Sequence, residues 1–267
     1  MENILKKIIT KKKERIVNYK KSISEAHLLN NIKEVKGFID FKKKIVTRSN
    51  KNEISVIAEI KKASPSAGVI VENFSHLDIA KIYEDNGATC LSVLTEEDFF
   101  QGQISFMSDI KKKIKIPILC KDFFIDTYQV VLAKNYCADC ILIILSALDL
   151  NQAKDLYQAA NDLNISTLIE VHTQQEAEAA LFFENALIGI NNRNLKTLEI
   201  SLDTTVKLSK ILKSHKSPLI CESGIKSNYD LKYIVENSNI YNFLIGESVL
   251  KKANIGEGLR EFTQITL

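Results

Sequence analysis

Short apolar segments recur along the chain about every 20 to 35 residues, the length of one strand–helix unit. They are rich in β-branched side chains, as expected of strands that are buried on both faces of a parallel sheet. Eight such segments occur, at 54–58, 89–94, 116–120, 140–144, 166–169, 186–190, 218–221 and 242–245. The pattern predicts eight parallel strands.

The segments between these strands have helical spacing and defined starts. Four begin with the pattern of a capping box, in which a side-chain oxygen accepts hydrogen bonds from first-turn N–H groups. These are Ser75-x-x-Asp78, Asp126-x-x-Gln129, Thr173-x-x-Glu176 and Ser227-x-x-Asp230. Eight strand–helix units predict an α/β protein with a single closed (β/α)8 barrel of the TIM type. The alternative is an open doubly wound sheet, but no Gly-x-Gly-x-x-Gly follows the first strand.

Residues 1–50 precede the first strand and predict an N-terminal helical extension. Apolar positions mark two amphipathic helices in it, at Ile4, Leu5, Ile8 and Ile9 and at Ala26, Leu28, Leu29 and Ile32. We expect this extension to pack on a catalytic barrel domain that spans residues 51–267.

Composition restricts the class of protein. The chain has 267 residues, of which 45% are hydrophobic and 26% charged, values typical of globular proteins. The longest apolar run, 138–150, is interrupted by Asp139 and Asp149 and is too short to span a membrane. The first residues lack the apolar core of a secretory signal. We therefore expect a cytoplasmic protein without membrane partners.

The net charge is only +3, but the first 53 residues hold 15 Lys/Arg and 6 Asp/Glu. A basic segment of this kind can bind nucleic acid. Here the lysines fall between Ile, Leu and Val rather than among aromatic side chains that stack on bases. A solvated helix face is favoured, and no nucleic-acid partner is expected.

The five cysteines predict neither disulfides nor a metal site. Their number is odd and most lie in the apolar segments. Cys137-x-x-Cys140 matches a redox or metal motif, but no second such pair occurs and the four histidines are scattered.

Charged and polar residues stand at the carboxyl ends of the predicted strands, where such barrels place their active sites. Charges beside buried strands cost several kcal/mol unless they are paired. Any one of them is explained by a solvated loop, but their convergence on one rim favours a shared site. The candidates are Glu59, Lys61, Lys121, Glu170, Asn191 and Glu222.

Lys121 would lie among Glu59, Glu170 and Glu222, and neighbouring carboxylates favour the protonated ammonium. This pattern makes Lys121 a cationic acid that donates to a carbonyl oxygen, with Glu170 as the matching base.

A phosphate site is predicted beside this group. Ser223-Gly224 and Gly246-Glu247 follow the last two strands, where barrels commonly bind phosphate, although glycine also serves ordinary turns. Glu247 suits an anion only if its side chain turns away and its N–H points inward. The polar loop 61–68 is either a solvated connection or a mobile lid that brings Lys61 to an anionic substrate.

Ordered motifs across nearly the whole chain resemble those of the indole-3-glycerol phosphate synthase family. They begin with Ile-Ala-Glu-Ile-Lys-Lys-Ala-Ser-Pro-Ser at 57–66 and continue at 91–96, 99–102, 117–123, 189–195, 222–225 and 243–248. The resemblance implies conversion of 1-(2-carboxyphenylamino)-1-deoxyribulose 5-phosphate to indole-3-glycerol phosphate, CO₂ and water in tryptophan synthesis. It also implies a small phosphorylated substrate and no metal or organic cofactor. We expect the chain to act as a monomer.

The resemblance assigns roles to individual residues. Lys121 is the general acid that protonates the substrate carbonyl, and Glu170 transfers a proton during dehydration. Further residues contact the substrate or these two groups, namely Glu59, Lys61, Ser64, Asn191, Glu222 and Ser223. The phosphate is assigned to Gly224, Gly246 and Glu247.

The chain departs from the family pattern at two positions. Ala67 stands where the loop usually has lysine, which puts one lid or phosphate contact in doubt, and Asn194 stands where aspartate is usual. The enzyme alternative, a phosphoribosylanthranilate isomerase, needs a Cys/Asp pair at other strand ends. The non-enzyme alternative is an inactive phosphate-binding barrel acting as a scaffold, against which the retention of Lys121, Glu170 and Asn191 argues.

Overall fold

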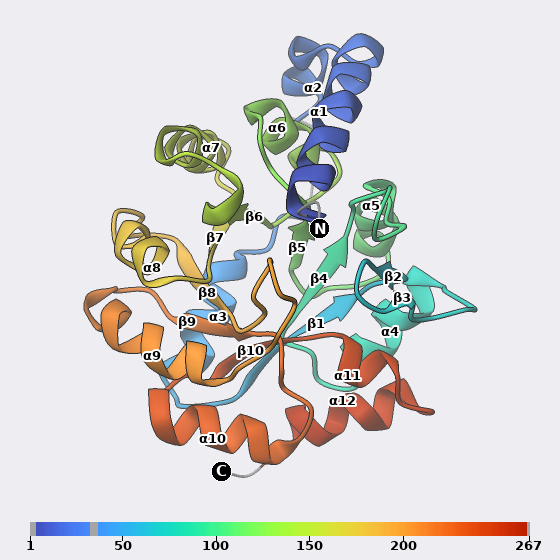
Figure 1. The fold of residues 1–267 in the computed structure, drawn as a ribbon. Coiled ribbons are helices and arrows are strands. Elements are labelled where there is room, and N and C mark those ends of the chain that lie inside the picture. Colours follow the sequence, from blue (N-terminus) through green and yellow to red (C-terminus); the bar gives the residue numbers. More distant parts are fainter. Residues whose placement is uncertain (1–3, 33–36, 266–267) are drawn as a thin grey trace.

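In the computed structural model, which describes residues 4–32 and 37–265, eight parallel strands close into a barrel (Figure 1). The strands are β1 (Ser55–Ile60), β4 (Cys90–Leu94), β5 (Ile118–Lys121), β6 (Cys140–Ile144), β7 (Ser166–Val171), β8 (Leu187–Asn191), β9 (Leu219–Glu222) and β10 (Asn242–Ile245). β1 pairs with β4 on one side and with β10 on the other, which completes the ring. The predicted barrel is confirmed, and each predicted strand end lies within about two residues of the observed one.

Helices surround the barrel between consecutive strands (Figure 1). They are α4 (His76–Asp85), α5 (Ser105–Lys111), α6 (Thr127–Asn135), α7 (Leu150–Asp162), α8 (Gln174–Ala180), α9 (Asp203–Ile211), α10 (Asn228–Ser238), α11 (Glu247–Leu250) and α12 (Ile255–Thr263), with 3-10 turns η1 (Leu145–Ala147) and η2 (Leu212–Ser214).

The predicted capping patterns mark real helix starts. Asp126 and Ser227 form complete capping boxes, and Ser75 and Thr173 each accept a hydrogen bond from a first-turn amide. Another complete box, at Asp149 and Gln152, was not predicted.

The barrel interior is filled by alternate residues of the strands. Inward-facing apolar side chains form one buried cluster, which includes Ile57, Leu119, Leu168, Leu187, Ile220 and Leu244. The intervening residues belong to a separate cluster that packs beneath the helices. This two-residue alternation therefore determines which polar residues face inward farther along each strand.

In its described residues, 4–32 and 37–50, the N-terminal extension contains three helices, not two. α1 (Ile4–Ser22) and α2 (Glu25–Ile32) pack against α6, through Ile16 and Leu28 of the extension and Tyr128 of α6 among others. The unpredicted helix is α3 (Phe41–Ser49), and Phe41 and Ile45 from it belong to the buried cluster inside the barrel. Its sequence has few apolar positions, so its periodicity is weak. The predicted extension also includes residues 1–3 and 33–36, which lie outside the described residues.

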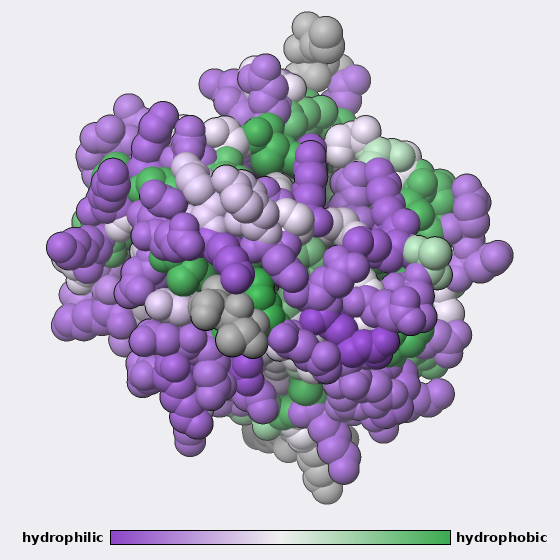
Figure 2. Space-filling view, turned by 90° about the horizontal axis from the view of Figure 1, so that it is seen from below, coloured by the Kyte–Doolittle hydropathy of each residue, from purple (hydrophilic) through white to green (hydrophobic). Residues whose placement is uncertain are grey.

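The face of the molecule in Figure 2 carries mainly hydrophilic side chains, with apolar residues in small, separate patches. Within the described residues, each helix is too short or too polar to cross a bilayer.

Candidate active site

A cavity of about 750 Å³ lies at the carboxyl ends of the barrel strands. Every residue predicted for the site lines it. These residues are Glu59, Lys61, Ser64, Lys121, Glu170, Asn191, Glu222, Ser223, Gly224, Gly246 and Glu247. The volume is typical of small-molecule sites. Their functional roles remain predictions, which we develop below.

Strand alternation explains why the charged residues point inward. Glu59 is two positions after the inward-facing Ile57, and Lys121 is two after Leu119. Glu170 and Glu222 stand in the same relation to Leu168 and Ile220. The strands thus place a layer of polar groups directly above an apolar plug.

Lys121 is held between two carboxylates from other strands. Its Nζ lies 2.6 Å from Oε2 of Glu222 and 3.2 Å from Oε2 of Glu170. Burial disfavours the ammonium, but attraction from Glu222, Glu170 and Glu59 outweighs it and raises the pKa of Lys121 well above its usual value. Lys121 is therefore a cation at neutral pH, as predicted.

The pKa values of the two glutamates beside Lys121 are shifted in opposite directions. Burial opposes ionisation of Glu170, yet Lys121 and His172 outweigh it and hold its pKa well below the usual range, helped by the Asn191 side chain. Burial and the charge of Glu170 together raise the pKa of Glu222 to about 7, despite the attraction of Lys121. The site thus favours the ionised form of Glu170, whereas Glu222 is the more readily protonated of the two carboxyl groups.

Glycine at position 189 makes room for this arrangement. A Cβ atom there would collide with Oε1 of Glu222. Within the described residues, that buried oxygen has no hydrogen-bond partner, which further disfavours the charged form of the carboxyl group.

Glu59 and Lys61, from β1 and the loop that follows it, form a second ion pair, with Nζ 2.5 Å from Oε1. Gly246 lies against Glu59, because a Cβ atom at 246 would fall 2.6 Å from Oε1. The structure thus gives glycine at 246 a role in accommodating a carboxylate, besides the predicted close approach of a phosphate.

The loop after β1 contains a small antiparallel hairpin, β2 (Ala63–Ser64) paired with β3 (Gly68–Val69). Ser64 is buried, and its Oγ accepts a hydrogen bond from the Ala67 amide at 3.2 Å. Part of the predicted lid is therefore a defined turn at the cavity wall.

The predicted phosphate corner has an unusual backbone. Ser223 and Gly224 both have positive φ, 63° and 92°, and a Cβ atom at 224 would fall 2.7 Å from Ile200. Only glycine fits at 224 without displacement. The Glu247 carboxylate pairs with Lys251 at 2.6 Å and approaches Arg193 at 4.0 Å, so neighbouring cations offset its charge.

Several lining residues were not predicted as site residues. Arg193 and Lys226 add cationic groups near the phosphate corner, and Arg193 belongs to the family-like motif at 189–195. Ile4, Leu5 and Ile8 of α1 also line the cavity. No local signal predicted them, because their placement depends on how the extension packs.

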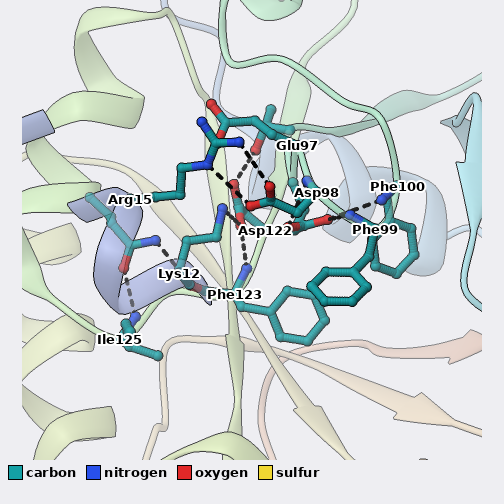
Figure 3. Close-up of polar contacts among 12 residues, drawn as sticks. Lys12, Arg15, Glu97, Asp98, Phe99, Phe100, Asp122, Phe123 and Ile125 are labelled. Carbon is teal, nitrogen blue, oxygen red and sulfur yellow. Dashed lines mark hydrogen bonds and ion pairs between the residues drawn. The ribbon is translucent and has the colours of Figure 1, made fainter. Parts of the chain in front are cut away.

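Polar contacts attach α1 to the barrel next to the site (Figure 3). Lys12 is buried and pairs with Asp122 at 2.7 Å, and Asp122 also accepts a hydrogen bond from Thr95 Oγ1 at 2.7 Å. Nearer the surface, Arg15 binds Asp98 at 2.8 Å and Glu97 at 3.3 Å. We call this group, Lys12, Arg15, Glu97, Asp98 and Asp122, the α1 latch.

The α1 latch adjoins both the catalytic candidates and the cavity wall. Asp122 directly follows Lys121, and Phe123 and Phe100 lie together beneath the latch with ring centres 6.2 Å apart (Figure 3). Both rings line the cavity. Among the described residues, no cluster of three or more metal-ligating side chains occurs.

Comparison with solved structures supports the fold alone. A protein from Aquifex aeolicus VF5 aligns with a TM-score of 0.63 at 12% identity, over 84% of this chain and 98% of that one. A 3-hexulose-6-phosphate synthase aligns with a TM-score of 0.62 at 11% identity, over 79% and 99%.

Sequence comparison is more specific. A synthase from Polynucleobacter necessarius is 42% identical over 98% of this chain and 99% of its own length, and one from Legionella pneumophila strain Lens is 42% identical over 98% of both. Both are named indole-3-glycerol phosphate synthase, as is the family model that matches residues 5–262. With a lysine–carboxylate cluster at the mouth of a closed barrel and relatives matched end to end, this chain belongs to the indole-3-glycerol phosphate synthase family.

Proposed function

We propose that this chain carries out the family reaction, which closes 1-(2-carboxyphenylamino)-1-deoxyribulose 5-phosphate to indole-3-glycerol phosphate with loss of CO₂ and water. The observation that carries the proposal is the Lys121–Glu170–Glu222 cluster inside a cavity of about 750 Å³. The reaction needs proton donors for two steps, a base and a site for an aromatic anion bearing a phosphate, and the cavity offers each of them.

Lys121 serves the ring-closing step. The ring carbon that bears the carboxylate attacks the sugar carbonyl carbon, and the carbonyl oxygen becomes an alkoxide. Lys121 donates a hydrogen bond to this oxygen and then transfers a proton to it. Although the raised pKa makes Lys121 a weak acid, the developing alkoxide is a strong base and accepts the proton.

Loss of CO₂ follows without a further protein group. The electron pair of the breaking C–C bond returns to the ring, and restored aromaticity drives the step. Removal of the hydroxyl as water then requires a proton on the leaving oxygen, which the Lys61 ammonium supplies, and loss of a proton from the neighbouring carbon.

Glu170 takes that carbon-bound proton. Lys121 lowers the pKa of Glu170, so a Lys121 that has given up its proton no longer suppresses the basicity of Glu170. The acid step therefore prepares the base for the elimination step. Asn191, which also contacts Glu170, keeps the carboxylate oriented.

The remaining cavity residues support binding of the substrate. Ile8, Phe100 and Phe123 form an apolar wall for the aromatic ring. The loops after β9 and β10 take the phosphate, through backbone N–H groups of Gly224 and Glu247 and with Arg193 and Lys226 supplying positive charge. Ser64, Glu59, Lys61 and Ser223 contact the middle of the substrate.

Turnover by the purified chain tests this proposal. The indole product fluoresces, whereas an inactive scaffold barrel binds the substrate without forming it. We expect Lys121→Ala to abolish turnover with an unchanged circular dichroism spectrum, and Glu170→Gln to lower kcat by about 100-fold or more. Substantial residual kcat in Lys121→Ala would exclude the acid role.

We further propose that the protein acts as a monomer in the cytoplasm and binds no nucleic acid. Five free thiols suit a reducing compartment. Light scattering on the purified chain and a salt-dependent nucleic-acid binding assay test the first and last statements.

A further inference from the structure

A buried histidine that the mechanism above does not use faces the catalytic-base candidate. His172 follows Val171, the last residue of β7, and its side chain is only 7% exposed. Its Nε2 lies 3.2 Å from Oε1 of Glu170, on the side of the carboxylate opposite Lys121. The contact has the length of an ion pair but not the alignment of a hydrogen bond. The two oxygens of Glu170 therefore face two different cationic groups.

The far side of the imidazole is fixed by Glu176. Nδ1 of His172 lies 3.3 Å from Oε2 of Glu176, and the same oxygen accepts a hydrogen bond from the His172 amide at 2.7 Å. Glu176 itself is held in the first turn of α8, where its amide donates to Thr173 Oγ1. The start of α8 thus sets the position of the ring.

The charges around the imidazole favour its cationic form. Burial opposes protonation, but the carboxylates of Glu170 and Glu176 prevail and raise the pKa of His172 to about 9. Glu170 faces the ring from β7 and Glu176 from α8, while Lys121 of β5 lies beyond the other oxygen of Glu170. The cationic ring is therefore favoured, with Nδ1 facing Glu176 and Nε2 facing Glu170.

We propose that His172 is a positioning residue for Glu170, and that the chain Glu176–His172–Glu170 clamps the carboxylate in the orientation used for proton transfer. This inference rests on the proposed role of Glu170. Without the imidazolium, Glu170 turns toward Lys121, because among the cations that face it only Lys121 still attracts it. The same contact supplies positive charge that remains after Lys121 has given up its proton.

The first test is the variant His172→Asn, which removes the cation. We expect kcat to fall about 10- to 100-fold, the range that misplacement of a catalytic group produces, with KM within about twofold of the wild-type value. The matched control is His215→Asn, which alters a partly buried histidine that contacts Phe183 O and Ser217 O, away from the cavity. The control keeps wild-type kcat. A kcat of His172→Asn equal to that of the control overturns the proposal.

The second test separates positioning from a structural effect. In a Glu170→Gln background, His172→Asn has little further effect on kcat, because the group that it positions is already absent. If His172→Asn lowers kcat by a further 10- to 100-fold in the Glu170→Gln background, His172 acts independently of Glu170 and the proposal is overturned. If Glu170→Gln alone leaves kcat unchanged, the proposed base role fails instead.

The third test does not need a soluble His172 variant. Glu176→Gln retains an oxygen that can accept a hydrogen bond from the His172 amide, but it removes the negative charge that faces Nδ1 of His172. The four histidines give few enough NMR signals to titrate individually. We expect the His172 midpoint to fall from about 9 toward 6.5 and kcat to fall with it. An unchanged midpoint, or a lowered midpoint with wild-type kcat, overturns the proposal.

Discussion

The α1 latch offers a sharp test of how the extension supports the barrel. Lys12 and Asp122 have side chains that are 5% and 11% exposed, and their charged atoms lie 2.7 Å apart. The variant Lys12→Met keeps a long unbranched side chain with good helix propensity but leaves Asp122 without its cation. We expect loss of stability rather than a neutral surface change.

The structure sets the size of this effect. Removing one partner of a buried pair costs about 3–5 kcal/mol, because the other charge stays buried and uncompensated. Asp122 retains hydrogen bonds from Thr95 Oγ1 and the Phe123 amide, both at 2.7 Å. A cavity of about 20 Å³ beside Lys12 and Asp122 also has room for one water molecule. The cost therefore falls at the lower end, about 3 kcal/mol.

Thermal and urea unfolding measure this change. For a domain of this size, about 3 kcal/mol lowers Tm by about 6–12 °C. Lys13→Met is the matched control, since it makes the same substitution on an exposed position of the same helix and should leave Tm unchanged. KM should rise in Lys12→Met, because α1 also carries Ile4, Leu5 and Ile8 of the cavity wall.

A double variant checks the cause. Asp122→Asn in the Lys12→Met background removes the stranded charge, so the double variant loses less stability than the sum of the two single variants, by about 1–3 kcal/mol. The reasoning is refuted if Lys12→Met has the Tm of Lys13→Met, or if the two single effects simply add.

Three further predictions concern the cavity and its pH dependence. Ala67→Lys adds a cation at the cavity wall, and we expect KM to fall about threefold at low salt, an effect that steady-state assays should see vanish as ionic strength rises. Gly189→Ala forces Glu222 away from Lys121, so kcat should drop about 100-fold; wild-type kcat would contradict the close packing described at this position. The pKa of His172, about 9 in the fold against 6.5 ordinarily, means that the folded state binds the proton more tightly. Its contribution, at most about 3 kcal/mol, is complete below pH 6.5 and is lost as the pH rises through 9. Urea unfolding should therefore show that the difference in free energy of unfolding between wild type and His172→Asn is smaller at pH 9.5 than at pH 6. An equal difference at the two pH values would contradict the assignment.

The amino-acid sequence alone predicted the strands, four of the helix starts and the direction of the site residues. These features depend on local rules, namely the two-residue alternation of a strand and the hydrogen-bonding of a first helical turn. Once Ile57 and Leu119 face inward, Glu59 and Lys121 must do the same. The helix that was missed, α3, is stabilised by contacts of Phe41 and Ile45 inside the barrel, which local periodicity does not encode.

The pairing of charges, by contrast, depends on how the strands are arranged in space. Lys121 pairs with Glu222 and Glu170 rather than with Glu59, which takes Lys61 instead. Closure of the ring and the stagger of its strands set these distances, and they in turn drive the pKa values of Glu170 and Glu222 apart. Lys12 of the extension gained its partner Asp122 in the same way, whereas both carboxylates that face His172 lie within four residues of it in the sequence. Electrostatic energy depends on separation and burial in space, so residues far apart in the sequence acquire their chemistry only when the chain folds.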